Sequence, residues 1–391
     1  MHVLMTTDTV GGVWTYSLEL ARALQRYDVH VSLATMGAPL TADQRHDAEA
    51  LENVDLLESE YRLEWMDEPW DEVADAGVWL LELDRQLRPD VVHLNQFSFG
   101  AALWSAPCLL VGHSCVLSWF DAVRGAAAGP EWKRYREVVR CGLQGADLVA
   151  APTAAMLRCL QTHYGPLKNA RAILNGRSPD YGHALAKENV VLTAGRLWDE
   201  AKNVAAVVEV APRLSWPVHV AGIPRPGDGS HGHGENGNLE NGRVKFLGRL
   251  SAAEMEHAYS RTAIYALPAR YEPFGLTPLE AALAGCALVL GDIPTLREVW
   301  GETATFVNPN DTRALQEALQ NLIDDDTRRA DSIAQTTARA RVLTEQQMGE
   351  QYWQAYCQLR ASGPRRTARA RPHRAPLRTN SKITTGQQGT A

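Results

Sequence analysis

Short apolar segments separated by helical patterns recur along most of the chain, and they constrain its fold more than any other feature. The first segment, residues 2–7 (HVLMTT), is followed by a turn and then by Leu18, Ala21 and Leu24 at helical spacing. Continuous apolar strands that alternate with helices predict a parallel sheet covered on both faces. Further strand candidates of the same series are residues 29–37, 55–59, 91–96, 107–114, 146–153 and 170–176.

A second series of apolar segments begins after a break near residues 180–188. It ends with an amphipathic helix at 311–325, whose apolar residues form one stripe. Two such halves predict an α/β fold of two doubly wound Rossmann-like domains that face each other across a cleft. We assign residues 1–185 to the first domain and residues 186–344 to the second. The strand candidates of the second series are residues 189–197, 217–223, 244–248, 262–268, 286–292 and 303–309.

The composition is that of a globular protein with a substantial core. Of the 391 residues, 45% are hydrophobic and 22% are charged, and the length fits two domains because single cores rarely exceed about 250 to 300 residues. The sequence has no run of about eighteen apolar residues that would span a bilayer. Its start lacks the basic flank and apolar stretch of a signal peptide. We therefore expect a cytoplasmic location.

Charge is distributed unevenly along the chain. The net charge is −7, but the residues from Ser362 onward contain seven Lys or Arg and no acidic residue, which leaves −14 on residues 1–361. Such an acidic body argues against nucleic acid as a partner. The tail at 362–391 has almost no large apolar residues, so we expect it to be disordered. It would act as a solubilising extension or make weak contact with an anionic membrane surface.

The cysteines and histidines form no pattern that predicts a metal site. The six cysteines are scattered, mostly within apolar runs, without CxxC spacing, and we interpret them as buried thiols. His231 and His233 lie in a Gly/Asn-rich stretch at 225–242, which we interpret as a mobile surface loop. We assign no metal ligand.

Two glutamates, Glu272 and Glu280, stand in the segment ARYEPFGLTPLEAALAGC. Pro278 suits the first position of a short helix, and Thr277 would then be its N-cap, so that Glu280 could simply close a capping box. The same helix start also presents unpaired amides and a positive dipole end, which suit a phosphate. Glu272 has no capping role, so its carboxylate could accept hydrogen bonds from sugar hydroxyls. The pattern leaves both interpretations of Glu280 open.

Two cations stand in AGRLWDEAKN (194–203), which follows the first strand of the second series. Arg196 and Lys202 would lie beyond the carboxyl end of that strand, where they could grip a diphosphate, the arginine in bidentate fashion. Charged loops are usually only solvated. The two cations therefore indicate a diphosphate site only in combination with the Glu-Pro-Phe-Gly loop.

Several of these segments together resemble a known family. GRLWDEAKN, VKFLGRLS and EPFGLTPLEAALAGC are similar, in order and spacing, to the donor-site motifs of the family 4 retaining glycosyltransferases of the GT-B fold. DTVGGVWTYSLELARAL resembles the glycine-rich first loop of that family. ILNGRSPD resembles its NGVD segment, except that Arg177-Ser178-Pro179 stand where the family usually has a valine and an acid. The resemblance covers about residues 1–361 and implies that a final helix, at 345–361, returns to the first domain.

The resemblance implies a role for each matching position. Arg196 and Lys202 would bind the donor diphosphate and stabilise it as the leaving group. Glu280 would hold the ribose hydroxyls, and Glu272 would contact the transferred sugar. His113 would face the donor sugar, although a lone histidine is otherwise more often a packed strand end. The other implied donor-binding positions, around the phosphates, the sugar and the base, are Gly11, Gly12, Arg249, Leu250, Phe274, Gly275, Leu276 and Thr277.

The sequence thus predicts an enzyme, a retaining hexosyltransferase that moves a sugar from a nucleotide diphosphate sugar to a glycan, lipid-linked or small-molecule acceptor. No cofactor or metal is expected, because Arg196, Lys202 and the helix N-terminus would neutralise the departing diphosphate. The alternatives are a nucleotide-sugar epimerase or hydrolase on the same architecture and a non-catalytic sugar-nucleotide sensor. A nicotinamide oxidoreductase is disfavoured because TDTVGGVW does not match GxGxxG.

Overall fold

A computed structural model describes residues 1–182, 185–222 and 242–362 of the chain. The His/Gly-rich stretch and the basic tail lie almost wholly outside the described residues, so the surface loop, the disorder and the membrane contact remain predictions from the sequence. Within the described ranges, no helix has the length and apolar character needed to cross a membrane.

The first domain is built on a parallel sheet that comprises seven of the strands in the described residues, in the order β3-β2-β1-β4-β5-β6-β7. β1 pairs with β2 from His2 opposite His30 to Asp8 opposite Met36, and it pairs with β4 on its other side. Each strand coincides with an apolar segment of the first series, so the predicted α/β class is confirmed for this half. The strands are β1 (His2–Asp8), β2 (His30–Met36), β3 (Val54–Leu57), β4 (Val91–Leu94), β5 (Cys108–Val111), β6 (Leu148–Ala151) and β7 (Ala170–Ala172).

The second domain repeats this plan with a parallel sheet of six strands, again counted over the described residues, in the order β10-β9-β8-β11-β12-β13. All of these strands fall on apolar segments of the second series. They are β8 (Glu188–Ala194), β9 (Val218–Ala221), β10 (Val244–Gly248), β11 (Thr262–Leu267), β12 (Ala287–Gly291) and β13 (Thr305–Val307).

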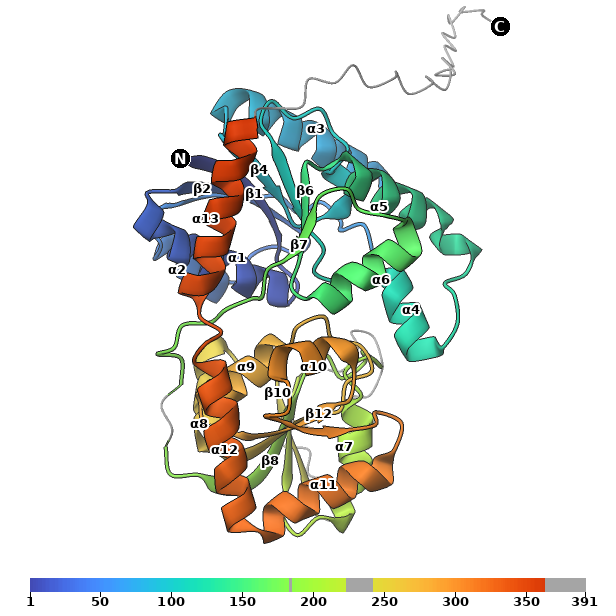
Figure 1. Cartoon of the computed structure of the whole chain (residues 1–391), viewed down its shortest axis with the longest axis vertical. Coiled ribbons are helices and arrows are strands. Elements are labelled where there is room, and N and C mark those ends of the chain that lie inside the picture. The colour runs from blue at the N-terminus through green and yellow to red at the C-terminus, as the bar shows by residue number, and fades with distance from the viewer. Residues whose placement is uncertain (183–184, 223–241, 363–391) are drawn as a thin grey trace, which may run out of the picture.

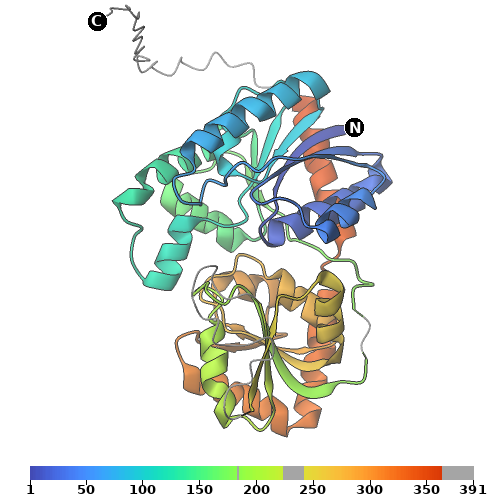
Figure 2. The ribbon, with the colours of Figure 1, turned by 180° about the vertical axis from the view of Figure 1, so that it is seen from behind.

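Helices cover both faces of each sheet, as Figures 1 and 2 show from opposite sides. Alternate residues of β1 face different apolar clusters, with Leu4 on one face and Val3 and Met5 on the other, because successive side chains of a strand point to opposite faces. Both faces are therefore buried, which is why the strands read as continuous apolar runs. The helices of the first domain are α1 (Gly12–Leu24), α2 (Ala42–Glu49), α3 (Trp70–Leu87), α4 (Val116–Arg124), α5 (Lys133–Gly145) and α6 (Ala154–Tyr164).

The last helix of the chain packs on the first domain rather than on the second. The chain runs from α12 in the lower lobe of Figure 1 to α13 in the upper lobe, and α13 packs beside α1 with Tyr352 and Tyr356 in the same apolar cluster as Met5. The two domains are therefore joined twice, before β8 and before α13. The remaining helices are α7 (Val204–Val210), α8 (Ala252–Arg261), α9 (Leu276–Leu283), α10 (Pro294–Trp300), α11 (Thr312–Asp324), α12 (Asp326–Ala340) and α13 (Glu345–Ser362).

Polar contacts hold the domains against each other beside α6. The backbone amides of Ala154 and Ala155, at the start of α6, donate to the carboxylate of Glu298 on α10 at 2.6 and 2.8 Å. The hydroxyl of Thr153 donates to the carbonyl of Pro273 at 3.1 Å. An acidic side chain at a helix N-terminus is stabilised by the helix dipole, so this contact favours the facing arrangement of the domains.

Candidate active site

The strand orders place the predicted site residues at the same edge of each sheet. In the first sheet the order reverses between β1 and β4, and in the second between β8 and β11. Ligands of open α/β sheets bind beyond the carboxyl ends of the strands at such reversal points. The segments that follow these strands and the adjacent β5 carry six of the thirteen predicted residues: Gly11, Gly12, His113, Arg196, Lys202 and Glu272.

Lys202 and Glu272 form an ion pair at this edge. The Lys202 Nζ donates to Glu272 Oε2 at 2.5 Å, and the two side chains are 22% and 12% exposed. Because β8 and β11 are neighbours in the sheet, the loops that follow them meet although the residues are far apart in the sequence. The carboxylate uses one of the three donors of the ammonium group, which leaves donors for a ligand.

The guanidinium of Arg196 is fixed by the buried carboxylate of Asp199, which the sequence interpretation missed. Its Nη2 donates to Asp199 Oδ2 at 2.7 Å, and its guanidinium lies 5.2 Å from the ring centroid of Trp198. Burial would raise the pKa of Asp199, but Arg196, the indole donor of Trp119 and Lys202 outweigh burial and keep that pKa below its ordinary value. Asp199 is therefore ionised and fixes a guanidinium that stays 45% exposed. The spacing of three residues between Arg196 and Asp199 in GRLWDE is the sequence signal that could have predicted this pair.

The helix after Glu272 begins earlier than predicted, and the capping box is wrong. α9 starts at Leu276 with Gly275 as N-cap, because Gly275 adopts φ +92°, a conformation that glycine reaches without strain. Pro278 is therefore the third helical residue rather than the first. The hydroxyl of Thr277 accepts a hydrogen bond from Tyr265 at 2.9 Å instead of capping the helix. Among the described residues no side chain caps α9, so its first amides remain available for an anion.

Glu280 lies in the second turn of α9, and its carboxylate faces Arg177 in the segment between the domains. Oε1 of Glu280 is 3.2 Å from Nε of Arg177, and the Glu280 side chain is 12% exposed. A residue at this position of the helix cannot reach back to the N-cap amide. The interpretation of Glu280 as a capping residue is thus excluded, and an ionic or ligand role is left.

The first loop meets the start of α9 across the domain boundary. Gly11 has φ +116° and is the N-cap of α1, and both Gly11 and Gly12 are exposed. A Cβ atom placed on Gly12 would lie 3.5 Å from Cδ1 of Leu276. The two predicted phosphate-contacting segments therefore lie side by side, one from each domain.

His113 follows β5 in a fixed protonation state. Its Nε2 is 2.7 Å from Oδ1 of Asn95, whose own amide nitrogen donates to the carbonyl of Thr6 at 2.6 Å. The amide orientation places the proton on Nε2 of His113, so Nδ1 is an acceptor. Burial lowers the pKa of His113 to about 3, so the ring is neutral at pH 7. The next residues, Ser114 and Cys115, contact the hydroxyl of Tyr271 at 3.5 and 3.0 Å, beside Glu272.

The remaining predicted residues are less closely associated with the ion pair. Arg249 and Leu250 lie in the turn between β10 and α8, Arg249 exposed and Leu250 partly packed on the apolar cluster of the second domain. Among the described residues neither forms a hydrogen bond or ion pair with Lys202 or Glu272. Phe274 is only 3% exposed and its ring belongs to the same cluster. Only its backbone could therefore face a ligand.

Asp8, at the end of β1, is a further carboxyl that the sequence interpretation did not select. It is 8% exposed and accepts a hydrogen bond from the amide of Val10 at 3.1 Å. Burial raises its pKa to about 7, although the Val10 amide and the charge of Arg196 act in the opposite direction. A carboxyl that is readily protonated near neutral pH can tolerate an anion at the adjacent glycine loop.

This pKa predicts that Asp8→Asn stabilises the fold at pH 8 but not at pH 4. A carboxyl whose folded pKa is raised contributes stability below its unfolded pKa of about 3.9, and that contribution is lost as pH rises through about 7. The asparagine avoids a cost of up to about 4 kcal/mol at pH 8, since each pKa unit corresponds to about 1.4 kcal/mol. Thermal unfolding at both pH values measures the difference in stability between Asp8→Asn and the wild type. Asp47→Asn, an exposed position of α2, is the control; equal shifts at both pH values in Asp8→Asn would contradict the prediction.

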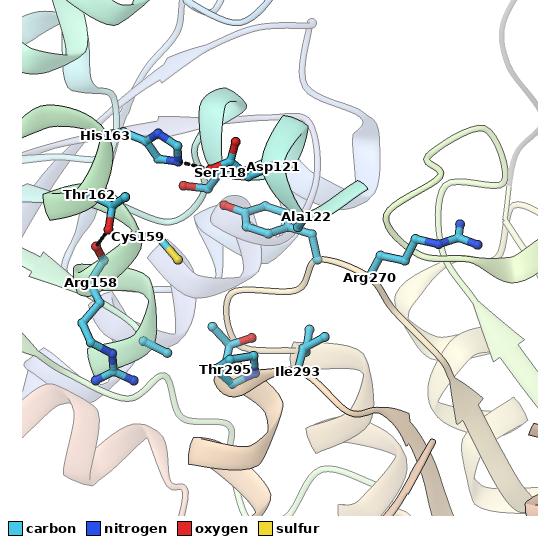
Figure 3. A pocket seen from close by; sticks show the side chains of 13 residues that line it. Ser118, Asp121, Ala122, Arg158, Cys159, Thr162, His163, Arg270, Ile293 and Thr295 are labelled. Atoms are coloured by element: carbon cyan, nitrogen blue, oxygen red, sulfur yellow. Dashed lines mark hydrogen bonds and ion pairs between the residues drawn. The ribbon is translucent and has the colours of Figure 1, made fainter. Parts of the chain in front are cut away.

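A pocket of about 480 Å³ lies between the domains, separate from the predicted residues (Figure 3). Cys159 and the ion-paired His163 and Asp121 line it from the first domain, and Tyr271 and Thr295 from the second. The hydroxyl of Thr295 donates to the carbonyl of Glu272 at 2.6 Å. The pocket therefore lies directly beside Glu272.

Comparison with known proteins agrees with this geometry. Residues 10–181 match the family model "Glycosyltransferase Family 4" and residues 188–325 match "Glycosyl transferases group 1", which together span more than half of the chain. The glycogen synthase of Mycobacterium tuberculosis is 28% identical over 290 residues, 68% of this chain and 67% of the relative. The chain belongs to the family 4 glycosyltransferases of the GT-B fold.

Solved structures show the same fold. Sucrose-phosphate synthase from Thermosynechococcus elongatus has a TM-score of 0.76 at 19% identity and covers 93% of this chain and 100% of its own. Anabaena Alr3699/HepE, solved in complex with UDP and glucose, has a TM-score of 0.71 at 18% identity, with 92% of this chain and 100% of its own covered. The family models make the protein a glycosyltransferase, and nothing in these comparisons supports the epimerase alternative.

Proposed function

We propose that the enzyme transfers a hexosyl unit from a nucleotide diphosphate sugar to a glycan acceptor, with retention at the anomeric carbon. One observation carries the proposal: Lys202, paired with Glu272, lies at the carboxyl edge beside the uncapped start of α9, with Arg196 held by Asp199 in the same loop. Two cations and free amides at one edge suit a diphosphate whose charge grows as it departs. The glycan acceptor is favoured by the likeness to a glycogen synthase.

The roles of the residues follow from their partners. Glu272 and Asp199 keep the two cations in place before the donor binds, so little reorganisation is needed when the diphosphate leaves. Glu280 would accept hydrogen bonds from the ribose hydroxyls. Neutral His113 would contact the sugar from the first domain. No metal ion is required in this scheme, because the cations and the helix N-terminus neutralise the leaving group.

A donor-consumption assay tests this function. The Anabaena neighbour was solved with UDP and glucose, which makes UDP-glucose the first donor to test, with ADP-glucose and GDP-mannose beside it. We expect nucleoside diphosphate release only when α-glucan oligosaccharides are present, an α-linked product in the NMR spectrum, and the same rate in EDTA. Equal release in water alone would establish a hydrolase, and a β-linked product would rule out retention.

A further inference from the structure

Arg177 joins two largely buried carboxylates that come from different domains. Its Nη1 donates to Glu19 Oε1 at 2.6 Å, and its Nε lies 3.2 Å from Oε1 of Glu280. Glu19 belongs to α1 of the first domain, and Glu280 belongs to α9 of the second. The side chains of Glu19, Arg177 and Glu280 are 5%, 14% and 12% exposed, and the ring of Tyr181 lies 4.4 Å from the guanidinium carbon.

The contact of Arg177 with Glu280 is ionic but does not occupy the acceptor oxygens. Although Nε of Arg177 is close to the carboxylate, it makes no hydrogen bond within the described residues, because the angle is unsuitable. Neither oxygen of the Glu280 carboxylate receives a hydrogen bond from any other described residue. Glu280 is thus held near a positive charge while its lone pairs remain free for a ligand hydroxyl.

The charge of Arg177 is needed because the other surroundings of Glu280 disfavour its ionised form. Burial raises the pKa of Glu280, Arg177 opposes that rise, and Glu19 and Glu256 add to it. Tyr181, Tyr259 and Tyr265 also face this carboxylate. Among these groups, Arg177 alone carries a positive charge. Arg177 stands where NGVD, the family segment that ILNGRSPD resembles, has a valine.

We propose that Arg177 is a positioning residue for the nucleotide: it places a positive charge beside the Glu280 carboxylate, aims that carboxylate at the ribose hydroxyls, and ties its orientation to α1 through Glu19. The inference rests on the proposed donor-binding role of Glu280. α1 begins at Gly12, which lies against Leu276 at the start of α9. Arg177 links Glu19 of α1 to Glu280 of α9, so it connects the same two helices one turn or more beyond their first residues. Recognition of the ribose is therefore coupled to the position of the glycine loop at residues 11–12.

Binding of ribonucleotides and deoxyribonucleotides tests the proposal. We would titrate UDP, ADP and GDP, each beside its 2′-deoxy counterpart, and take the ratio of the two dissociation constants. A wild-type preference for the ribonucleotide of about tenfold or more is expected for a hydroxyl bound to a charged acceptor. In Arg177→Met the ratio should fall below about threefold, and Arg177→Lys should restore part of it. A merely structural role of Arg177 would weaken both nucleotides equally and leave the ratio unchanged.

Two further variants keep the result decisive. Arg22→Met removes a second partner of Glu19, at 2.7 Å, from a side chain that is 42% exposed and does not contact Glu280, so the wild-type ratio should persist. If Arg177→Met does not fold, Glu19→Gln/Arg177→Met removes the stranded carboxylate of Glu19 and allows the same measurement.

The possible results distinguish failure of this inference from failure of the proposed donor-binding role of Glu280. A wild-type ratio in the Arg177 variants, together with a lost ratio in Glu280→Gln, would overturn the inference alone. A wild-type ratio in Glu280→Gln, or no binding of any diphosphate by the wild type, would overturn the proposed role of Glu280 and the inference with it.

Discussion

Arg196→Ala and Lys202→Ala should each lower kcat by about 10²- to 10³-fold, the loss that follows removal of one preorganised donor from a site of developing charge. Both cations lie at the edge where, in the proposed mechanism, the diphosphate leaves, and each is held by a carboxylate, Asp199 or Glu272. Initial rates with UDP-glucose and a glucan acceptor measure the loss. Near-normal kcat in either variant would remove that residue from the mechanism.

The two variants should differ in stability. Arg196 is 45% exposed, so its loss should leave the melting temperature almost unchanged. Lys202→Ala strands the largely buried Glu272, at a cost of about 1 to 3 kcal/mol in the free energy of unfolding. Arg213→Ala is the matched control, because the side chains of Arg213 and its partner Glu209 are 50% and 59% exposed, so its loss should affect neither kcat nor stability.

Glu272→Gln and Glu280→Gln should impair different steps. Glutamine keeps the shape of Glu272 but removes the charge that faces Lys202 and, in the proposed site, the sugar, so we expect kcat to fall about 10²-fold with little change in melting temperature. Glu280→Gln should weaken nucleoside diphosphate binding by roughly 1.5 to 3 kcal/mol, the scale for a hydrogen bond to a charged group, and leave kcat at saturating donor largely intact.

Calorimetric titration beside initial rates separates these effects. Asp324→Gln, a change at an exposed acid at the end of α11, serves as a control for loss of negative charge. Wild-type affinity and wild-type rates in both glutamate variants would mean that Glu272 and Glu280 serve only the fold.

The architecture was predictable from the sequence because local pattern and tertiary structure agree in the strands. Segments such as residues 3–7 and 262–268 are buried throughout and mainly apolar, since both faces of each strand are covered. The start of α9 was not predictable in this way. Thr277 and Pro278 favour a helix start at Pro278, but Gly275 adopts a left-handed conformation and starts the helix at Leu276.

The candidate site was only partly predictable, for a different reason. Arg196, Lys202 and Glu272 stand in the loops that follow the neighbouring strands β8 and β11, so topology brings them to the same edge of the sheet. The partners of Arg177 lie 158 positions away at Glu19 and 103 positions away at Glu280, and a pattern of local spacing carries no information about such pairs. Asp8 was missed because its raised pKa comes from burial, which depends on the packed structure.

The central claim is that the cations of the second domain grip the diphosphate of a nucleotide sugar, and one binding measurement tests it most directly. UDP, ADP and GDP are titrated into the wild type and into Arg196→Ala/Lys202→Ala, with melting temperatures recorded for both proteins. The account predicts that at least one diphosphate binds the wild type and that its affinity falls at least 100-fold, about 2.7 kcal/mol, in the folded double variant. Equal affinity in the two proteins, or no binding to the wild type, would contradict it.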